Sequence, residues 1–365
     1  MPGVYLSFPF CAQKCSFCNF ASGAFSHELE TRYYGALSAE VSAHSWNWIP
    51  ETIYLGGGTP SNMDLAQLER VLSQIPGRPW GEATLETAPG SITKEKAQTW
   101  RTIGINRVSL GVQSFAGREL ASTGRRHTAE IVAADCETLR SAGIDNLNID
   151  LIAGLPHQTP ESWRESLEWV RRLDPPHVSV YMFEVDEDSR LGLEVLNNGP
   201  RYGASAVPAD DVAADLYEIA VADLASFGIE RYEISNFARP GAESLHNLKY
   251  WTMAPYVGFG VDAHSFDGSH RWGNRDEVRD YVDAVLSGAD PRASTTDAQV
   301  AGERIFTGLR LTQGVRLSAQ EWDRHRDAIH RFMDAGLLVA QADTVRLTSR
   351  GVLLSNEVFQ EFLAA

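Results

Sequence analysis

The chain is poor in cysteine, in basic residues and in long apolar segments, and each shortage excludes a class of protein. Only four of its 365 residues are cysteines, so we expect no disulfide framework of the kind found in secreted domains. Acidic side chains outnumber basic ones by 48 to 32, which argues against a nucleic-acid partner. No apolar run approaches the roughly 18 residues that cross a membrane, and no secretory leader is visible. We therefore expect a cytoplasmic protein without a membrane span.

Short β-rich runs alternate with longer helical patterns through the first two thirds of the chain. Strands are expected at residues 4–8, 52–56, 83–87, 107–112, 146–152, 177–183 and 231–235. Helices are expected at residues 27–45, 63–75, 93–103, 129–142, 160–173 and 209–227. This alternation predicts an α/β fold of βα units around a parallel sheet or barrel, with functional loops at the C-terminal ends of the strands.

A second, smaller domain is expected after about residue 285. The stretch LSGADPRASTTDA reads as a linker, and the residues after it suggest helices flanking a short β-hairpin, a winged-helix-like α+β arrangement. From Ser287 to the end there are nine basic and ten acidic residues, so the electrostatic footprint of a DNA-binding domain is missing. A packing role is the better interpretation of this domain.

Three of the four cysteines lie in PFCAQKCSFCNF, spaced C-x3-C-x2-C at Cys11, Cys15 and Cys18. A structural zinc site needs four Cys or His ligands, and no close fourth ligand is present; a simple zinc protein stays an alternative. A [4Fe–4S] cluster takes one thiolate per iron, so three cysteines leave one iron open to another ligand. The fourth cysteine, Cys136, falls within an expected helix and is interpreted as a buried structural thiol.

A glycine-rich stretch, YLGGGTP at residues 54–60, follows the second expected strand. Successive glycines let backbone groups approach a ligand where a Cβ would clash. Alone, the stretch is also readable as a bare turn.

The cysteine loop and the glycine stretch, one βα unit apart, closely resemble those of the radical SAM enzymes. The resemblance implies a partial (β/α)6 barrel in which the three cysteines hold a [4Fe–4S] cluster and S-adenosylmethionine (SAM) binds the open iron. The residues that it places around SAM are Tyr5, Phe17, Gly57, Gly58, Thr59, Glu86, Gln113, Arg125 and Asp150.

The whole chain is similar to the HemN/HemW group of radical SAM proteins, which contains oxygen-independent coproporphyrinogen III dehydrogenases and haem chaperones. Phe20 stands where the dehydrogenases carry an additional cysteine, and the chain begins only ten residues before Cys11. HNLKYW at residues 246–251 matches the HNxxYW motif of the chaperone branch, in which His246 is the implied haem ligand. His264, in GVDAHSF, is expected to be a structural hydrogen bonder rather than a second ligand. These features favour the chaperone branch.

Two positions depart from the group's pattern. Ser7 replaces the histidine of HIPFC, and Ala88 replaces the asparagine of ExNP. Despite these departures, SAM binding is still expected. Efficient decarboxylation is less expected.

The resemblance implies a domain at residues 1–285 that holds the cluster and SAM, and a HemN-type C-terminal domain at residues 286–365. The implied function is that of a haem chaperone that binds a [4Fe–4S] cluster, SAM and haem and delivers haem to haemoproteins. The alternative is an enzyme that oxidatively decarboxylates coproporphyrinogen III. Expected partners are haem-receiving proteins and a low-potential electron donor such as flavodoxin or ferredoxin.

Overall fold

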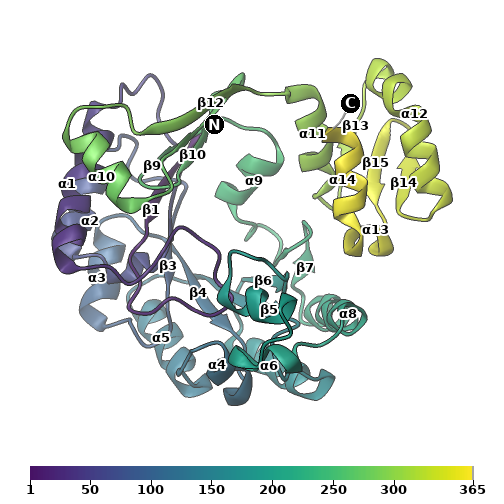
Figure 1. The fold of residues 1–365 in the computed structure, drawn as a ribbon, viewed down its shortest axis with the longest axis horizontal. Coiled ribbons are helices and arrows are strands. Elements are labelled where there is room, and N and C mark those ends of the chain that lie inside the picture. Colours follow the sequence, from purple (N-terminus) through teal and green to yellow (C-terminus); the bar gives the residue numbers. More distant parts are fainter. Residues whose placement is uncertain (364–365) are drawn as a thin grey trace.

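Six parallel strands, β1 to β6, form the centre of the fold (Figure 1). The structure is a computed structural model that describes residues 1–363. The strands are β1 Gly3–Phe8, β2 Thr52–Gly57, β3 Glu82–Thr87, β4 Arg107–Gln113, β5 Asn146–Ala153 and β6 His177–Met182. The main helices between and after them are α1 His27–Ala43, α2 Leu65–Leu72, α3 Lys94–Thr102, α5 Ala129–Ser141, α6 Pro160–Leu173 and α8 Asp210–Ser226. The first six expected strands and the six expected helices are confirmed, with ends that shift by a few residues.

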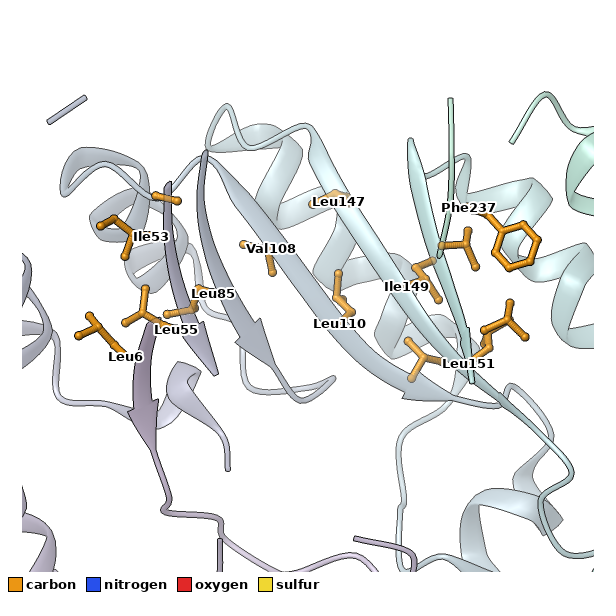
Figure 2. Close-up of a cluster of buried hydrophobic side chains, with 14 of the residues drawn as sticks. Leu6, Ile53, Leu55, Leu85, Val108, Leu110, Leu147, Ile149, Leu151 and Phe237 are labelled. Carbon is orange, nitrogen blue, oxygen red and sulfur yellow. The ribbon is translucent and has the colours of Figure 1, made fainter. Parts of the chain in front are cut away.

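Alternate side chains of these strands point toward the helices and form the core (Figure 2). Leu6, Leu55 and Leu85 lie in register on three neighbouring strands, and Val108 and Leu147 continue the row. All five side chains are buried. Each contributes roughly 1.5–3 kcal/mol through removal of its apolar surface from water, which specifies the face that each strand turns toward the helices.

The side chains between the core residues point to the opposite face, called the inner face below. Polar residues predominate on it, as in the register row Glu86, Ser109, Asn148 and His177. Strands of a parallel sheet that is covered on both faces are usually apolar throughout. The polar inner face is therefore the side on which a binding site can form.

A second group of strands extends the sheet beyond β1. β9 (Tyr256–Phe259) is parallel to β1, and β10 (His264–Phe266), β11 (His270–Asn274) and β12 (Arg292–Asp297) continue in antiparallel pairs. The expectation of a linker after residue 285 is therefore wrong for residues 292–297. β12 is an edge strand with all six side chains exposed, so no alternation of apolar and polar residues reveals it in the sequence.

The strand expected at residues 231–235 is a hairpin instead. β7 (Glu230–Arg231) and β8 (Asn236–Ala238) pair antiparallel with each other, and β8 also pairs antiparallel with β6. The chain reverses around Glu233, whose buried carboxylate accepts the backbone N–H of Ser235 at 2.9 Å. A side-chain hydrogen bond of this local kind competes with a continuous strand.

Helix α9 (Leu245–Trp251) lies between the sheet and the C-terminal part of the chain (Figure 1). Its contacts are with β2 and with α11 of that part. The other short elements are η1 Pro60–Asn62, α4 Gly117–Ser122, α7 Arg190–Leu196, η2 Arg201–Ala206 and α10 Val278–Leu286.

The C-terminal part has helices around a small antiparallel sheet. Its elements are α11 Val300–Leu309, β13 Val315–Arg316, α12 Ala319–Asp334, β14 Leu338–Gln341, β15 Thr344–Leu347, α13 Ser349–Leu353 and α14 Ser355–Leu363, with strand order β13-β15-β14. The β14–β15 hairpin beside α12 confirms the expected winged-helix-like α+β arrangement. Within residues 1–363, none of the helices combines the length and the apolar character that crossing a membrane requires.

Candidate functional site

The cysteine loop and the glycine stretch lie against each other at the C-terminal ends of β1 and β2. The backbone N–H of Gly58 donates to the carbonyl oxygen of Phe8 at 2.7 Å. A Cβ on Gly58 would lie 2.7 Å from the carbonyl carbon of Pro9 and 2.9 Å from Cys11 Sγ, so glycine is required here. The hydroxyl of Thr59 is 3.6 Å from the same sulfur. The two motifs therefore form one structural unit.

The three clustered cysteines are all partly exposed free thiols. Burial raises the pKa of Cys11, hydrogen bonds from Thr59 and Ser22 lower it, and the neighbouring Cys18 and Cys15 raise it. The sulfurs of Cys15 and Cys18 thus lie within electrostatic reach of Cys11. Iron binds the thiolate form, so loading this loop would release protons.

The geometry of this loop suits a cluster better than a single ion. Within residues 1–363, no three Cys, His, Asp or Glu side chains converge closely enough to hold one metal ion. A four-iron cluster gives each thiolate its own iron, so its ligands need not converge on a point. Three thiols in one loop, with Cys11 Sγ packed against Gly58, fit that group.

Glu86 lies on the inner face directly beside the glycine stretch. Its Oε1 accepts the hydroxyl of Tyr54 at 2.8 Å, and it also accepts the backbone N–H of Gly57. A Cβ on Gly56 would lie 3.0 Å from the hydroxyl of Tyr5 and 3.2 Å from Glu86 Oε1. Burial raises the pKa of Glu86 to about 7. A ligand ammonium or hydroxyl group at this position would stabilise the ionised carboxylate.

Arg125, Gln113 and Phe17 come together on the next part of the same rim. Arg125 Nη1 donates to the carbonyl oxygen of Gly111, and its guanidinium carbon lies 5.9 Å from the Phe17 ring centroid. A Cβ on Gly111 would lie 3.1 Å from Gln113 Nε2. Arg125 Nε is buried and has no hydrogen-bond partner among the described residues. Because an unpaired buried donor is costly, a carboxylate ligand would be favoured beside it.

Asp150 differs from Arg125 because its carboxylate oxygens already accept hydrogen bonds from the protein. Its carboxylate accepts the hydroxyl of Ser109 at 2.9 Å and the amide of Asn148 at 2.7 Å. Burial raises the pKa of Asp150, although these hydrogen bonds and Arg107 oppose the shift. Among the expected SAM residues, Asp150 therefore belongs to an internal polar network of the inner face.

Two polar residues that were not expected also face this region. Arg107, at the start of β4, is almost fully buried, and its positive charge lowers the pKa values of Glu86 and Asp150. His127 has a buried Nε2 without a partner among the described residues, and burial lowers its pKa to about 4, so it is neutral. Arg107 is in register with Thr84 on the inner face, so its place in the alternation of β4 could have identified it.

His246, the expected haem ligand, is fully buried at the opposite end of the parallel strands. Its Nδ1 is 2.8 Å from the hydroxyl oxygen of Thr52, and its Nε2 is 2.9 Å from that of Tyr250. Burial lowers the pKa of His246 to about 3, so the ring is neutral. Both ring nitrogens are occupied, and in this arrangement an iron atom can reach neither.

Glu82 holds the helix that carries His246. Its carboxylate accepts the hydroxyl of Ser244 at 3.1 Å and the backbone N–H groups of Leu245 and His246 at 2.9 and 3.0 Å. These N–H groups belong to the first turn of α9, where helical partners are missing. The N-terminus of α9 is therefore fixed to β3.

Two further residues can be compared with their expected roles. Cys136 on α5 is buried, which confirms the interpretation as a buried thiol. His264 has a side chain that is 69% exposed, and its Nε2 lies 3.7 Å from Asp262 Oδ1. The expected structural hydrogen-bonding role of His264 stays a prediction, and Asp262 is the partner that the structure offers.

Comparison with known proteins finds a matching family model for each of the two parts of the chain. Residues 5–170 match the family model of the radical SAM superfamily, and residues 296–354 match that of the HemN C-terminal domain. The chain is 33% identical to the haem chaperone HemW of Bacillus subtilis, over 100% of this chain and 99% of that protein. It is also 33% identical to the haem chaperone HemW of Mycobacterium tuberculosis, over 99% and 94%.

A solved structure shares the whole fold. Coproporphyrinogen III oxidase (HemN) from Escherichia coli, a radical SAM enzyme, superposes with a TM-score of 0.84 over 99% of this chain and 90% of that one. The two sequences are 22% identical, so this likeness describes the architecture and not the activity.

Proposed function

The chain belongs to the HemW family of radical SAM proteins, and from this premise we propose that it binds haem and delivers it to haem-requiring proteins. The similarity to the haem chaperone HemW of Bacillus subtilis, which spans 100% of this chain and 99% of that protein, carries the proposal. Phe20, at the position of the additional cysteine of the dehydrogenases, supports it. The Phe20 side chain is 64% exposed beside the cysteine loop and offers no ligand to a metal.

The same proposal assigns roles to the residues at the C-terminal ends of the strands. Cys11, Cys15 and Cys18 hold a [4Fe–4S] cluster, which supplies single electrons and an open iron when it is bound. SAM lies between the glycine stretch, Glu86 and Arg125. The unpaired Arg125 Nε binds its carboxylate, and the buried Glu86 binds its ammonium or ribose hydroxyl groups. A flavodoxin or ferredoxin is the proposed electron donor.

Ligation of haem by His246 stays a prediction, and it requires a rearrangement of the structure around this residue. The imidazole has to leave Thr52 and Tyr250, and the first turn of α9 is held by Glu82. Each lost buried hydrogen bond costs about 1–3 kcal/mol when its partner is left unsatisfied. The haem-bound form would therefore have α9 in another position.

A haem titration under anaerobic conditions tests the function. The chain with its reconstituted cluster is titrated with haem while the Soret band is followed, and the loaded protein is then mixed with a haem-free haemoprotein. We expect saturable binding near one haem per chain, followed by transfer of the Soret spectrum to the acceptor. The matched assay offers coproporphyrinogen III, SAM and a reductant to the same preparation. Formation of protoporphyrinogen without stoichiometric haem binding would refute the chaperone proposal in favour of the enzyme.

A further inference from the structure

Arg107, at the start of β4, is a buried cation without a carboxylate partner. The residue is 1% exposed, and no carboxylate oxygen within residues 1–363 lies within 4.0 Å of its guanidinium nitrogens. Its one hydrogen bond in that part of the chain is long, at 3.4 Å from Nη1 to the hydroxyl oxygen of Thr84, and its Nε has no partner there. Arginine is almost never fully buried unless it is paired, so an anionic ligand would supply the missing partner.

The Arg107 side chain points to the inner face of the sheet. Val108, the next residue, belongs to the core on the helix side (Figure 2), and successive side chains of a strand point to opposite faces. Burial is the main influence on the pKa values of Glu86, Asp150 and His177, and the positive charge of Arg107 lowers all three. These three groups come from β3, β5 and β6, on both sides of β4. The guanidinium group therefore lies well inside the inner face.

Partly accessible tyrosines surround Arg107 on this face. Burial raises the pKa values of Tyr54 on β2 and of Tyr232, the positive charge of Arg107 lowers them, and both residues are partly exposed. Burial and the Asp150 carboxylate raise the pKa of Tyr181 on β6, although 43% of this residue is exposed. A side chain that protein surrounds and solvent still reaches lines a hollow. The inner face near Arg107 therefore has room for part of a ligand.

A carboxylate is the anion that fits these surroundings. The planar guanidinium group binds a carboxylate through two parallel N–H···O hydrogen bonds, and the Nε of Arg107 is available for one of them. Tyrosine hydroxyl groups can donate to the remaining lone pairs of the carboxylate. The two bound groups would neutralise each other, so the buried charge of Arg107 would no longer be unpaired.

We propose that Arg107 binds a propionate side chain of haem on the inner face. This inference rests on the proposed haem-chaperone function, in which haem is the ligand other than SAM. SAM carries a single carboxylate, and the proposed function places that carboxylate at Arg125. A propionate is a short flexible chain that ends in a carboxylate, so it can reach Arg107 without the macrocycle itself entering the hollow. The inference does not depend on which residue ligates the iron.

Haem dimethyl ester, in which both propionates are esterified, tests this pairing. Soret titrations of the cluster-containing protein with haem and with the ester are compared for the wild type, Arg107→Met and Arg164→Met. Arg164 is the control, because it is an exposed arginine on α6. The wild type and the control should bind haem roughly tenfold or more tightly than the ester. Arg107→Met should bind both with the affinity of the wild type for the ester, because only the charged pair is lost.

Unfolding without haem separates this binding role from a structural one. Arg107→Met should unfold at a denaturant concentration no lower than that of the wild type, because the deleted charge has no carboxylate within 4.0 Å among residues 1–363. If Arg107 instead serves as the counter-ion of Glu86 and Asp150, its loss should destabilise the protein. Arg107→Gln keeps a polar group on the inner face and should give the same results, so it replaces the methionine variant if that variant does not fold.

The outcomes distinguish failure of this inference from failure of the proposed function. A wild type that does not bind haem contradicts the chaperone function itself. A wild type that binds haem and the ester alike, or an Arg107→Met variant that keeps the wild-type preference for haem, overturns the Arg107 inference alone. Equal loss of affinity for haem and ester together with lower stability assigns Arg107 a structural role and also overturns it. Loss of SAM affinity with an unchanged preference for haem would place the SAM carboxylate at Arg107 instead.

Discussion

The two ends of the parallel strands present different groups, and these groups are paired to different degrees. At the N-terminal ends, around α9, Glu82 accepts three hydrogen bonds and His246 makes two. At the C-terminal ends, Arg125 Nε and His127 Nε2 are buried without partners among the described residues, and three free thiols share one loop. His246 and Glu82 are thus paired within the protein, whereas the thiols and Arg125 Nε are not, although Arg107 Nε and Trp251 Nε1 near the N-terminal ends are also buried without partners among the described residues.

This difference separates residues that stabilise the fold from residues that bind. In βα barrels the C-terminal ends of the strands carry the sites, whereas the N-terminal ends serve stability. The HNLKYW helix lies at the stabilising end, although its sequence matches a haem-binding motif. Position in the fold and pairing of polar atoms therefore favour a structural role for His246, the residue that the sequence resemblance implies to be a haem ligand.

The largest effect is expected from the cysteine loop. Substitution of Cys11, Cys15 or Cys18 by alanine should each abolish the cluster, because three thiolates bind it and none is in excess. Iron and sulfide per chain after anaerobic reconstitution measure the loss. Cys136→Ala is the matched control and should retain the cluster, since Cys136 is a buried thiol on α5. A cluster that persists in any of the three variants would disprove the assignment of that ligand.

A smaller effect, on stability alone, is expected at the N-terminal ends of the strands, around α9. Glu82→Ala removes the acceptor of Ser244 Oγ and of two N–H groups of α9. Leaving these donors unsatisfied should lower the free energy of unfolding by about 3 kcal/mol. Thermal or denaturant unfolding of the cluster-containing protein measures it.

The cluster content distinguishes this effect from damage at the site. Glu82→Ala should keep its iron and sulfide, because the cysteine loop lies at the far end of the strands. Glu137→Ala, at an exposed position of α5, is the control and should change stability by less than about 0.5 kcal/mol. A Glu82→Ala variant as stable as the wild type would show that α9 is not held at its first turn.

The parallel strands could be predicted because their sequences alternate strongly. Val108, Leu110 and Val112 on β4 are apolar, and the residues that alternate with them are not, so strand and buried face follow from one pattern. β10 has three residues, and in β12 Ala293 is the one apolar residue among six exposed side chains. Such strands are stabilised by pairing with neighbouring strands, and no local sequence pattern predicts that pairing.

The motifs of the site could be predicted from the sequence, but the contacts between residues far apart in the sequence could not. The sequence placed the cysteine loop and the glycine stretch one βα unit apart, and in the structure they touch. The burial of His246 depends on Thr52, a residue 194 positions away. The His264 ring packs over Gly273 across a strand pair that the sequence did not reveal. Contacts of this range come from the tertiary fold and have no signature in either local sequence.

The smallest effect concerns the pH dependence of stability at Glu86. Burial raises its folded pKa to about 7, above the ordinary glutamate value, so the native state holds this proton more tightly than the unfolded state does. The stabilising contribution is therefore complete below the ordinary pKa and is lost as the pH rises through about 7. Between pH 5 and pH 8 the wild type should lose about 2 kcal/mol more stability than Glu86→Gln, which cannot titrate.

Added SAM sharpens this measurement, because a structural carboxylate and a binding carboxylate respond differently to it. If Glu86 faces the cationic or hydroxyl groups of SAM, saturating SAM stabilises the ionised form and lowers the folded pKa. The excess pH dependence of the wild type over Glu86→Gln should then shrink in unfolding experiments with SAM and persist without it. If SAM stabilises both proteins equally at pH 5 and pH 8, Glu86 belongs to the hydrogen-bonded interior with Tyr54. The residues that bind SAM would then lie nearer the C-terminal ends of the strands than Glu86 does.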